Sequence, residues 1–96
     1  MIIDKKTTEM YLDKPSKAIL DAKNSIFTQS DLQSAIDIEL KEIKPKKTFL
    51  LQSSYIIDSA HVITAQYRLD EVIKPFVRKI NEELNWNINV PDDIMK

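Results

Sequence analysis

The sequence contains no glycine and no cysteine, and His61 is the only histidine among its 96 residues. At average usage a chain of this length would hold roughly seven glycines. Three motifs cannot be written without glycine: the GxGxxG dinucleotide turn, the GxxxxGKS/T phosphate loop and the GxSxG nucleophile elbow. The absence of cysteine excludes disulfides, thiol nucleophiles and thiolate metal sites, and a single histidine excludes a site with two His ligands from one chain. The sequence therefore predicts a protein that is not an enzyme and needs no cofactor and no metal.

Charge of neither sign dominates the sequence. Lys and Arg together number 14 and Asp and Glu number 15, which gives a formal net charge of -1. A dedicated nucleic-acid domain usually carries a strong basic excess. Apolar runs such as Phe49–Leu51 are far shorter than the roughly 18 residues of a membrane span, and residues 1–6 lack the pattern of a signal peptide. We expect a single cytoplasmic domain over residues 1–96, with no membrane partner.

Pro15 marks the first helix start. Proline fixes φ and lacks an N–H, so it suits the first turn of a helix. The apolar residues after it recur at helical spacing, which predicts a helix from about residue 15 to residue 26. Residues 5–12 show the thinner pattern of a short helical turn before it.

The next helix has a capping pattern at its start and a proline at its end. Ser30 and Gln33 have the spacing of a capping box, although Phe27 or Thr28 can equally belong to the entry. The apolar stripe of this helix is Leu32, Ala35, Ile36, Leu40 and Ile43. Pro45 ends the helix, because the residue before a proline is disfavoured in the α region.

A long helical segment is predicted from about residue 50 to residue 84. In its second half, seven apolar residues fall within one arc of about 140° on a helical projection: Leu69, Val72, Ile73, Phe76, Val77, Ile80 and Leu84. Pro75 lies inside this stripe, where it removes the hydrogen bond to residue 71 and its ring clashes with the preceding turn. We therefore expect a kink or a break near residues 71–75.

The first half of the same segment is apolar on two faces. From Thr48 to Tyr67 the only formal charge is Asp58. Four residues lie opposite the arc used by the second half: Ile56, Ala60, Ile63 and Tyr67. A helix that is apolar on two sides is buried on two sides, and charge depletion is typical of the centre of an interface. We predict that these four residues form a protein-binding face, with a homodimer contact as the favoured case. The competing interpretation is that the first two helices of the same chain cover this face.

The sequence changes period near its C-terminal end. From Trp86 to Val90, apolar residues alternate with asparagines, which is the period-2 pattern of a strand or an extended docking segment. A lone strand cannot satisfy its backbone groups, so the segment needs a surface to lie on or a partner strand, for which residues 2–3 and 48–51 are candidates. We expect an extended tail over residues 86–96. Trp86 joins the candidate protein-binding residues, because tryptophan is enriched in interface hot spots.

Asp58 and His61 stand three residues apart, so a helix would bring their side chains together. A carboxylate beside an imidazole can serve general base chemistry or form part of a metal site. A local hydrogen-bonded pair is the simpler interpretation, because the sequence fixes no nucleophile and no further ligand cluster nearby.

Two groups of basic residues support an alternative function. They are Lys41, Lys44, Lys46 and Lys47 around Pro45, and Lys74, Arg78 and Lys79 later in the chain. Such groups can bind phosphates, although helix C-terminal charge and a solvated loop explain them more simply. Two short helices before a long one are compatible with a helix-turn-helix, but the tight turn of that motif often contains glycine, which this sequence lacks.

The predicted fold is all-α: three or four helices in a small antiparallel bundle, with a long third helix and an extended C-terminal tail. The predicted function is a non-enzymatic protein–protein interaction module, such as a regulator, an inhibitor, an immunity protein or an assembly chaperone. It would act through an apolar helical face on itself, on another protein, or on both. The alternative is a DNA-binding transcriptional regulator of the helix-turn-helix type. A composition rich in Lys, Ile, Asn and Asp suggests a bacterial or phage source.

Overall fold

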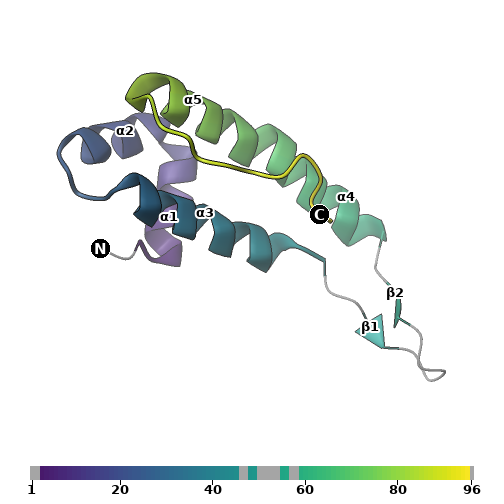
Figure 1. Ribbon diagram of the computed structural model, residues 1–96. Coiled ribbons are helices and arrows are strands. Elements are labelled where there is room, and N and C mark those ends of the chain that lie inside the picture. Colours follow the sequence, from purple (N-terminus) through teal and green to yellow (C-terminus); the bar gives the residue numbers. More distant parts are fainter. Residues whose placement is uncertain (1–2, 46–47, 50–54, 57–58, 96) are drawn as a thin grey trace.

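The computed structural model describes residues 3–45, 48–49, 55–56 and 59–95, which form a small all-α bundle (Figure 1). The first three helices are α1 (Lys5–Asp13), α2 (Pro15–Lys23) and α3 (Gln29–Ile43). A helical rod follows, made of α4 (Ser59–Arg68), the π-helical turn η1 (Leu69–Ile73) and α5 (Lys74–Leu84). Between α3 and the rod lie two short strands, β1 (Thr48–Phe49) and β2 (Tyr55–Ile56). In Figure 1, α3 runs toward the strands and the rod returns from them, which gives the predicted antiparallel arrangement.

The first two helices differ in length from the prediction. The expected short turn is a full helix, α1, whose N-terminus is capped by the Asp4 carboxylate, which accepts a hydrogen bond from the Thr7 N–H at 2.7 Å. Helix α2 begins at Pro15 as predicted, but it ends at Lys23. Shortly afterwards Ser25 adopts a φ of 61°, a left-handed conformation that does not continue a right-handed helix.

Helix α3 begins at a capping box formed by Thr28 and Asp31. The Thr28 hydroxyl oxygen accepts a hydrogen bond from the Asp31 N–H at 3.1 Å, and the Asp31 carboxylate accepts one from the Thr28 N–H at 2.9 Å. The predicted box of Ser30 and Gln33 is therefore wrong, and the alternative entry at Thr28 is the one used. The helix ends at Ile43, directly before the residues around Pro45, as predicted.

The helix predicted from about residue 50 is wrong at Tyr55–Ile56, which form a strand, and α4 is described from Ser59. Residues 50–54 and 57–58 of that prediction lie outside the described residues. The two strands pair antiparallel, with Thr48 opposite Ile56 and Phe49 opposite Tyr55. All four residues are β-branched or aromatic, and such side chains favour strands over helices. Hydrophobic periodicity alone does not separate a strand from a helix in a short apolar run, which explains the error.

The rod continues across Pro75 without a break. Within η1 the bonding changes to the π-helical pattern, and the Lys74 N–H donates to the carbonyl of Leu69. Pro75 lies in the first turn of α5, so its missing N–H falls where the bonding pattern changes. A π-helical turn at residues 69–73 thus precedes Pro75, where the sequence predicted a kink or a break near residues 71–75. Neither the rod nor any other helix in the described part of the chain is long and apolar enough to cross a membrane.

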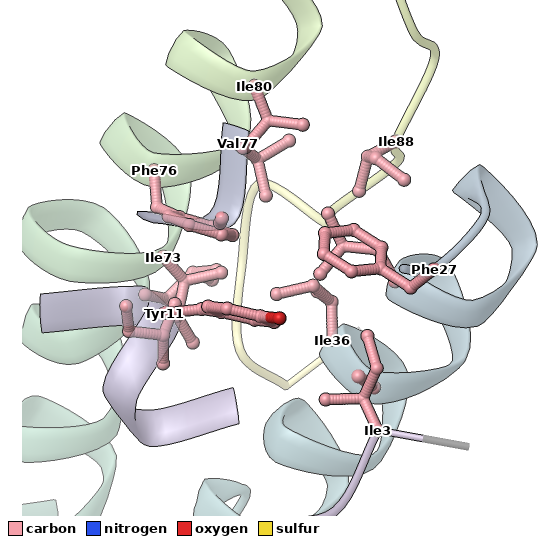
Figure 2. Close-up of a cluster of buried hydrophobic side chains, with 14 of the residues drawn as sticks. Ile3, Tyr11, Phe27, Ile36, Ile73, Phe76, Val77, Ile80 and Ile88 are labelled. Atoms are coloured by element: carbon pink, nitrogen blue, oxygen red, sulfur yellow. The ribbon is translucent and has the colours of Figure 1, made fainter. Parts of the chain in front are cut away.

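The hydrophobic core lies between the helices and is completed by the tail that follows α5. Its large side chains with the least exposure are Leu32, Ile36, Leu69, Ile73 and Ile80. Figure 2 shows Tyr11 and Phe27 in the same cluster, with ring centroids 5.2 Å apart, and Ile88 of the tail pointing into it. Ile88 and Ile94 are only 4% and 2% exposed, so the tail is part of the core.

Candidate docking face and the tail beside it

The structure divides the residues predicted to form a protein-binding face. Ala60, Ile63 and Tyr67 lie on α4 and are exposed. Ile56 lies in β2, before the helix begins, so it does not extend the helical face. Trp86 lies in the tail, away from the other four in sequence. Three of the five predicted residues therefore share one helical surface.

The exposed side of α4 carries the most exposed large hydrophobic residues of the described chain, Ile63 at 70% and Tyr67 at 66%. With Ala60 and Thr64 they recur at the i, i+3, i+4, i+7 spacing of one helical stripe. We name these four residues the α4 stripe. The opposite side of the helix enters the core through Ala65, which is 4% exposed. The described helices therefore leave this face open, contrary to the interpretation that the first two helices cover it.

A hollow of about 470 Å³ lies beside the α4 stripe. Two elements line it, α4 and the end of the tail, through Val62, Ile63, Gln66, Tyr67, Asp93 and Met95. Gln66, Asp93 and Met95 are not among the site residues predicted from the sequence. No local pattern marks them, because they reach the hollow only through the path that the tail takes across the bundle.

The tail runs back from α5 along the rod toward α4 (Figure 1). Amide side chains bond its backbone. The Asn81 side chain donates to the Ile88 carbonyl at 3.1 Å and accepts from the Ile88 N–H at 2.9 Å. The Gln33 side chain makes the same reciprocal pair with Asn89, at 3.0 Å and 2.8 Å. The tail therefore bridges α3 and α5.

Gln66 fixes the end of the tail on α4. Its side-chain amide donates to the Asp92 carbonyl at 3.2 Å, and its side-chain oxygen accepts from the Ile94 N–H at 2.9 Å. The Lys74 ammonium also donates to the Asp92 carbonyl, at 3.0 Å. Gln66 lines the hollow as well, so the same side chain joins the tail to the docking face.

Trp86, the remaining predicted residue, lies at the start of this tail and is partly buried. Its ring meets the ring of Phe27 edge-on, with the centroids 6.0 Å apart. Part of the Trp86 ring, which was predicted to bind a partner, therefore packs against a residue of the same chain. Residues 86–90 are extended, and the N–H groups of Ile88 and Asn89 donate to the side chains of Asn81 and Gln33. In the described part of the chain, residues 86–90 pair with no strand.

Two ion pairs lie close to the α4 stripe in the sequence. Arg68 follows Tyr67 directly, and its guanidinium donates to Glu39 on α3 at 3.0 Å. One turn later, Lys74 contacts Asp70 at 2.9 Å, and this hydrogen bond holds the pKa of the Asp70 carboxyl below its usual value. The stripe itself contains no ionisable group other than the Tyr67 phenol.

The structure gives little support for the Asp58–His61 pair or for the two basic groups as functional sites. Asp58 lies outside the described residues, and His61 is exposed at the start of α4. Within the described part of the chain, no group of three His, Asp or Glu side chains is placed to hold a metal ion. Of the basic groups, Lys46 and Lys47 lie outside the described residues, and Lys74 is engaged by Asp70 and by the tail.

Comparisons with protein-family models, with curated proteins and with solved structures find no match for this chain.

Proposed function

We propose that this protein is a non-enzymatic protein–protein interaction module that docks through the α4 stripe, with a second copy of the same chain as the partner. The observation that carries the proposal is the exposure of Ile63 and Tyr67, at 70% and 66%, beside a hollow of about 470 Å³. Exposed large apolar side chains that gather on one surface typify sites of protein association.

The charge of the stripe favours a second copy as the partner. Ala60, Ile63, Thr64 and Tyr67 carry no formal charge, and Arg68 beside them is bonded to Glu39. Within the stripe, two copies therefore meet without like-charge repulsion, which otherwise opposes the pairing of identical surfaces. The Asp93 carboxylate of each copy lies at the hollow beside the stripe.

The shape of the face supports the same partner. A two-fold contact joins the same patch on both subunits, so one patch must offer both a projection and a recess. Ile63 and Tyr67 supply exposed side chains, and the hollow that they share with Met95 supplies a recess. Ala60 is small, so two helices can approach closely at that point.

The proposed activity is binding without chemistry, as in a regulator, an inhibitor, an immunity protein or an assembly chaperone. The absence of cysteine and glycine, which removes the common nucleophile and phosphate-binding motifs, supports a non-enzymatic function. The cytoplasmic location expected from the sequence is part of the same proposal.

Sedimentation equilibrium of the full chain, from low micromolar to submillimolar concentration, tests the proposal. We expect a dimer for the wild type and a dimer dissociation constant more than about tenfold higher for Ile63→Lys, because the new ammonium would be desolvated in the contact. Leu20→Lys is the matched control: Leu20 is 54% exposed on α2, away from the stripe, and its replacement should leave the dimer intact. A monomeric wild type, or equal dissociation by both variants, would contradict the proposal. Salt-dependent retardation of DNA in a gel shift would favour the helix-turn-helix alternative instead.

A further inference from the structure

Among the described residues, side chains and not a ladder of backbone bonds hold the backbone of the tail. Asn81, Gln33 and Gln66 each donate one hydrogen bond to the tail backbone and accept one from it. An amide side chain offers the same donor and acceptor as a peptide group, so these three residues serve the tail as a neighbouring strand would. These three residues, together with the core residues that surround Ile88 and Ile94, bind one extended segment. We call this binding site the tail groove.

Several of the hydrogen bonds to the tail backbone are exposed to solvent. Both bonds between Gln33 and Asn89 are exposed, as are the bonds that the Asp92 carbonyl accepts from Gln66 and Lys74. Exposed hydrogen bonds exchange readily with bonds to water, so they contribute little against local opening. The bonds of Asn81 to Ile88 and of the Ile94 N–H to Gln66 are part-buried, so the tail is retained by these bonds and by the buried Ile88 and Ile94 side chains. The helices also contact one another directly, so an exchange requires release of the tail and not of the helices.

The tail enters the groove through a turn at a single residue, Asn85. Asn85 has φ 55° and ψ 42°, the left-handed conformation, directly after the last residue of α5. Its N–H and that of Trp86 both donate to the carbonyl of Asn81, which closes the turn. Glycine is the usual residue here, because any Cβ makes this conformation less favourable, and asparagine is the commonest substitute. A right-handed conformation at Asn85 would instead extend α5 and carry the tail away from its own bundle.

From this arrangement we infer that two copies of the chain exchange their tails, each placing residues 86–95 in the tail groove of the other. The structure itself identifies the occupant, because the groove is seen filled by this segment and a second copy carries the same one. The exchanged and unexchanged forms make the same tail contacts, so the balance between them depends on the conformation of Asn85 and on protein concentration. The inference rests on the tail contacts alone and does not depend on docking at the α4 stripe.

Two substitutions at Asn85 with opposite effects test the exchange. Both are made in an Ile63→Lys background, so that association through the α4 stripe is removed. Asn85→Gly favours the left-handed turn, whereas Asn85→Ala disfavours it and favours continuation of α5. In an exchanged dimer the left-handed turn at residue 85 is lost in both chains, so the preference of the substituted residue counts twice. The dimer dissociation constant should therefore be more than about tenfold lower for Asn85→Ala than for Asn85→Gly. Sedimentation equilibrium measures the constants, and circular dichroism verifies that both variants remain helical.

A third variant identifies the tail as the point of contact. Ile94→Asp, added to the Asn85→Ala chain, replaces the buried apolar side chain at the end of the tail with a carboxylate. We expect this variant to be a monomer that is still helical. The inference is overturned if Asn85→Ala stays monomeric at submillimolar concentration, or if its dimer survives Ile94→Asp. Weaker association of Ile63→Lys than of Leu20→Lys tests the α4 stripe. The difference between the two Asn85 variants, measured in one shared background, tests the tail, so the two proposals fail separately.

Discussion

Arg68 on α4 donates two hydrogen bonds to one oxygen of Glu39 on α3, from Nε at 3.2 Å and from Nη2 at 3.0 Å. Glu39 is 4% exposed and is the one buried carboxylate among the described residues. A buried carboxylate is costly without a cation, so this pair fixes α3 against the rod at the point where the α4 stripe ends.

Loss of the Arg68 guanidinium should therefore destabilise the fold. We expect Arg68→Met to lower the free energy of unfolding by about 2 kcal/mol, less than for a fully buried pair because Arg68 is partly exposed. Urea unfolding measures the change. Lys5→Met is the matched control, since it breaks the exposed Lys5–Glu42 pair at 3.4 Å and should cost no more than about 0.5 kcal/mol. Equal costs for the two variants would mean that Glu39 is not held by Arg68 in solution.

Tyr11 predicts a loss of stability at alkaline pH. Burial, assisted by a hydrogen bond from the Tyr11 hydroxyl to Asp21 at 2.7 Å, raises the pKa of Tyr11 to about 12. The folded pKa is above that of an unfolded tyrosine, near 10, so the fold favours the protonated phenol. Stability is therefore fully present below about pH 10 and falls by roughly 2–3 kcal/mol as the pH rises to about 12.

Tyr11→Phe separates this effect from other alkaline titrations. At neutral pH the variant should lose about 1 kcal/mol, because the hydrogen bond to Asp21 disappears. Between pH 10 and pH 12 its unfolding free energy should fall less steeply than that of the wild type. Parallel pH profiles for the two proteins would show that Tyr11 does not titrate with the fold.

The α3 cap gives a third prediction. Thr28→Ala removes the oxygen that accepts the Asp31 N–H and should cost about 1 kcal/mol. Ser30→Ala, at the start of the predicted but unused box, should change stability by less than about 0.5 kcal/mol. Thermal unfolding of both variants decides which serine or threonine caps the helix. A larger loss for Ser30→Ala would restore the capping box that the sequence alone favours.

Helix α3 illustrates what sequence patterns can specify. Its apolar stripe and Pro45 predict the helix and its end, because both depend on neighbours within a few residues. The start is less determined, since Thr28 and Ser30 are both acceptable caps and each has a suitable residue three positions later. Packing of the helix against its neighbours, which a local pattern does not contain, selects between them.

The segments on either side of α4 illustrate where sequence patterns fail. From Thr48 to Ile56 the residues are uncharged, with short apolar runs that suit a strand as well as a buried helix. The pairing of β1 with β2 is not encoded in either strand alone. Alternation does predict an extended tail, but nothing in the sequence marks Gln33 or Gln66 as its partners. Ile63 and Tyr67 were predictable as one face by projection, whereas the hollow beside them also requires Met95 from the tail.

The tail supplies the last prediction, which concerns its side chains. Ile88 is 4% exposed and points into the cluster that contains Phe27 (Figure 2), whereas Val90, two residues later, is only partly buried. Ile88→Ala should therefore lower the free energy of unfolding by about 2–4 kcal/mol, through lost burial and the cavity left behind. Val90→Ala should cost about 1 kcal/mol or less, because its neighbours and water already share the space around it. Urea unfolding at one protein concentration, low enough to keep the chain monomeric, compares the two. Similar small losses for both variants would mean that Ile88 is not seated in the core, and the tail would then be an appendage of the bundle.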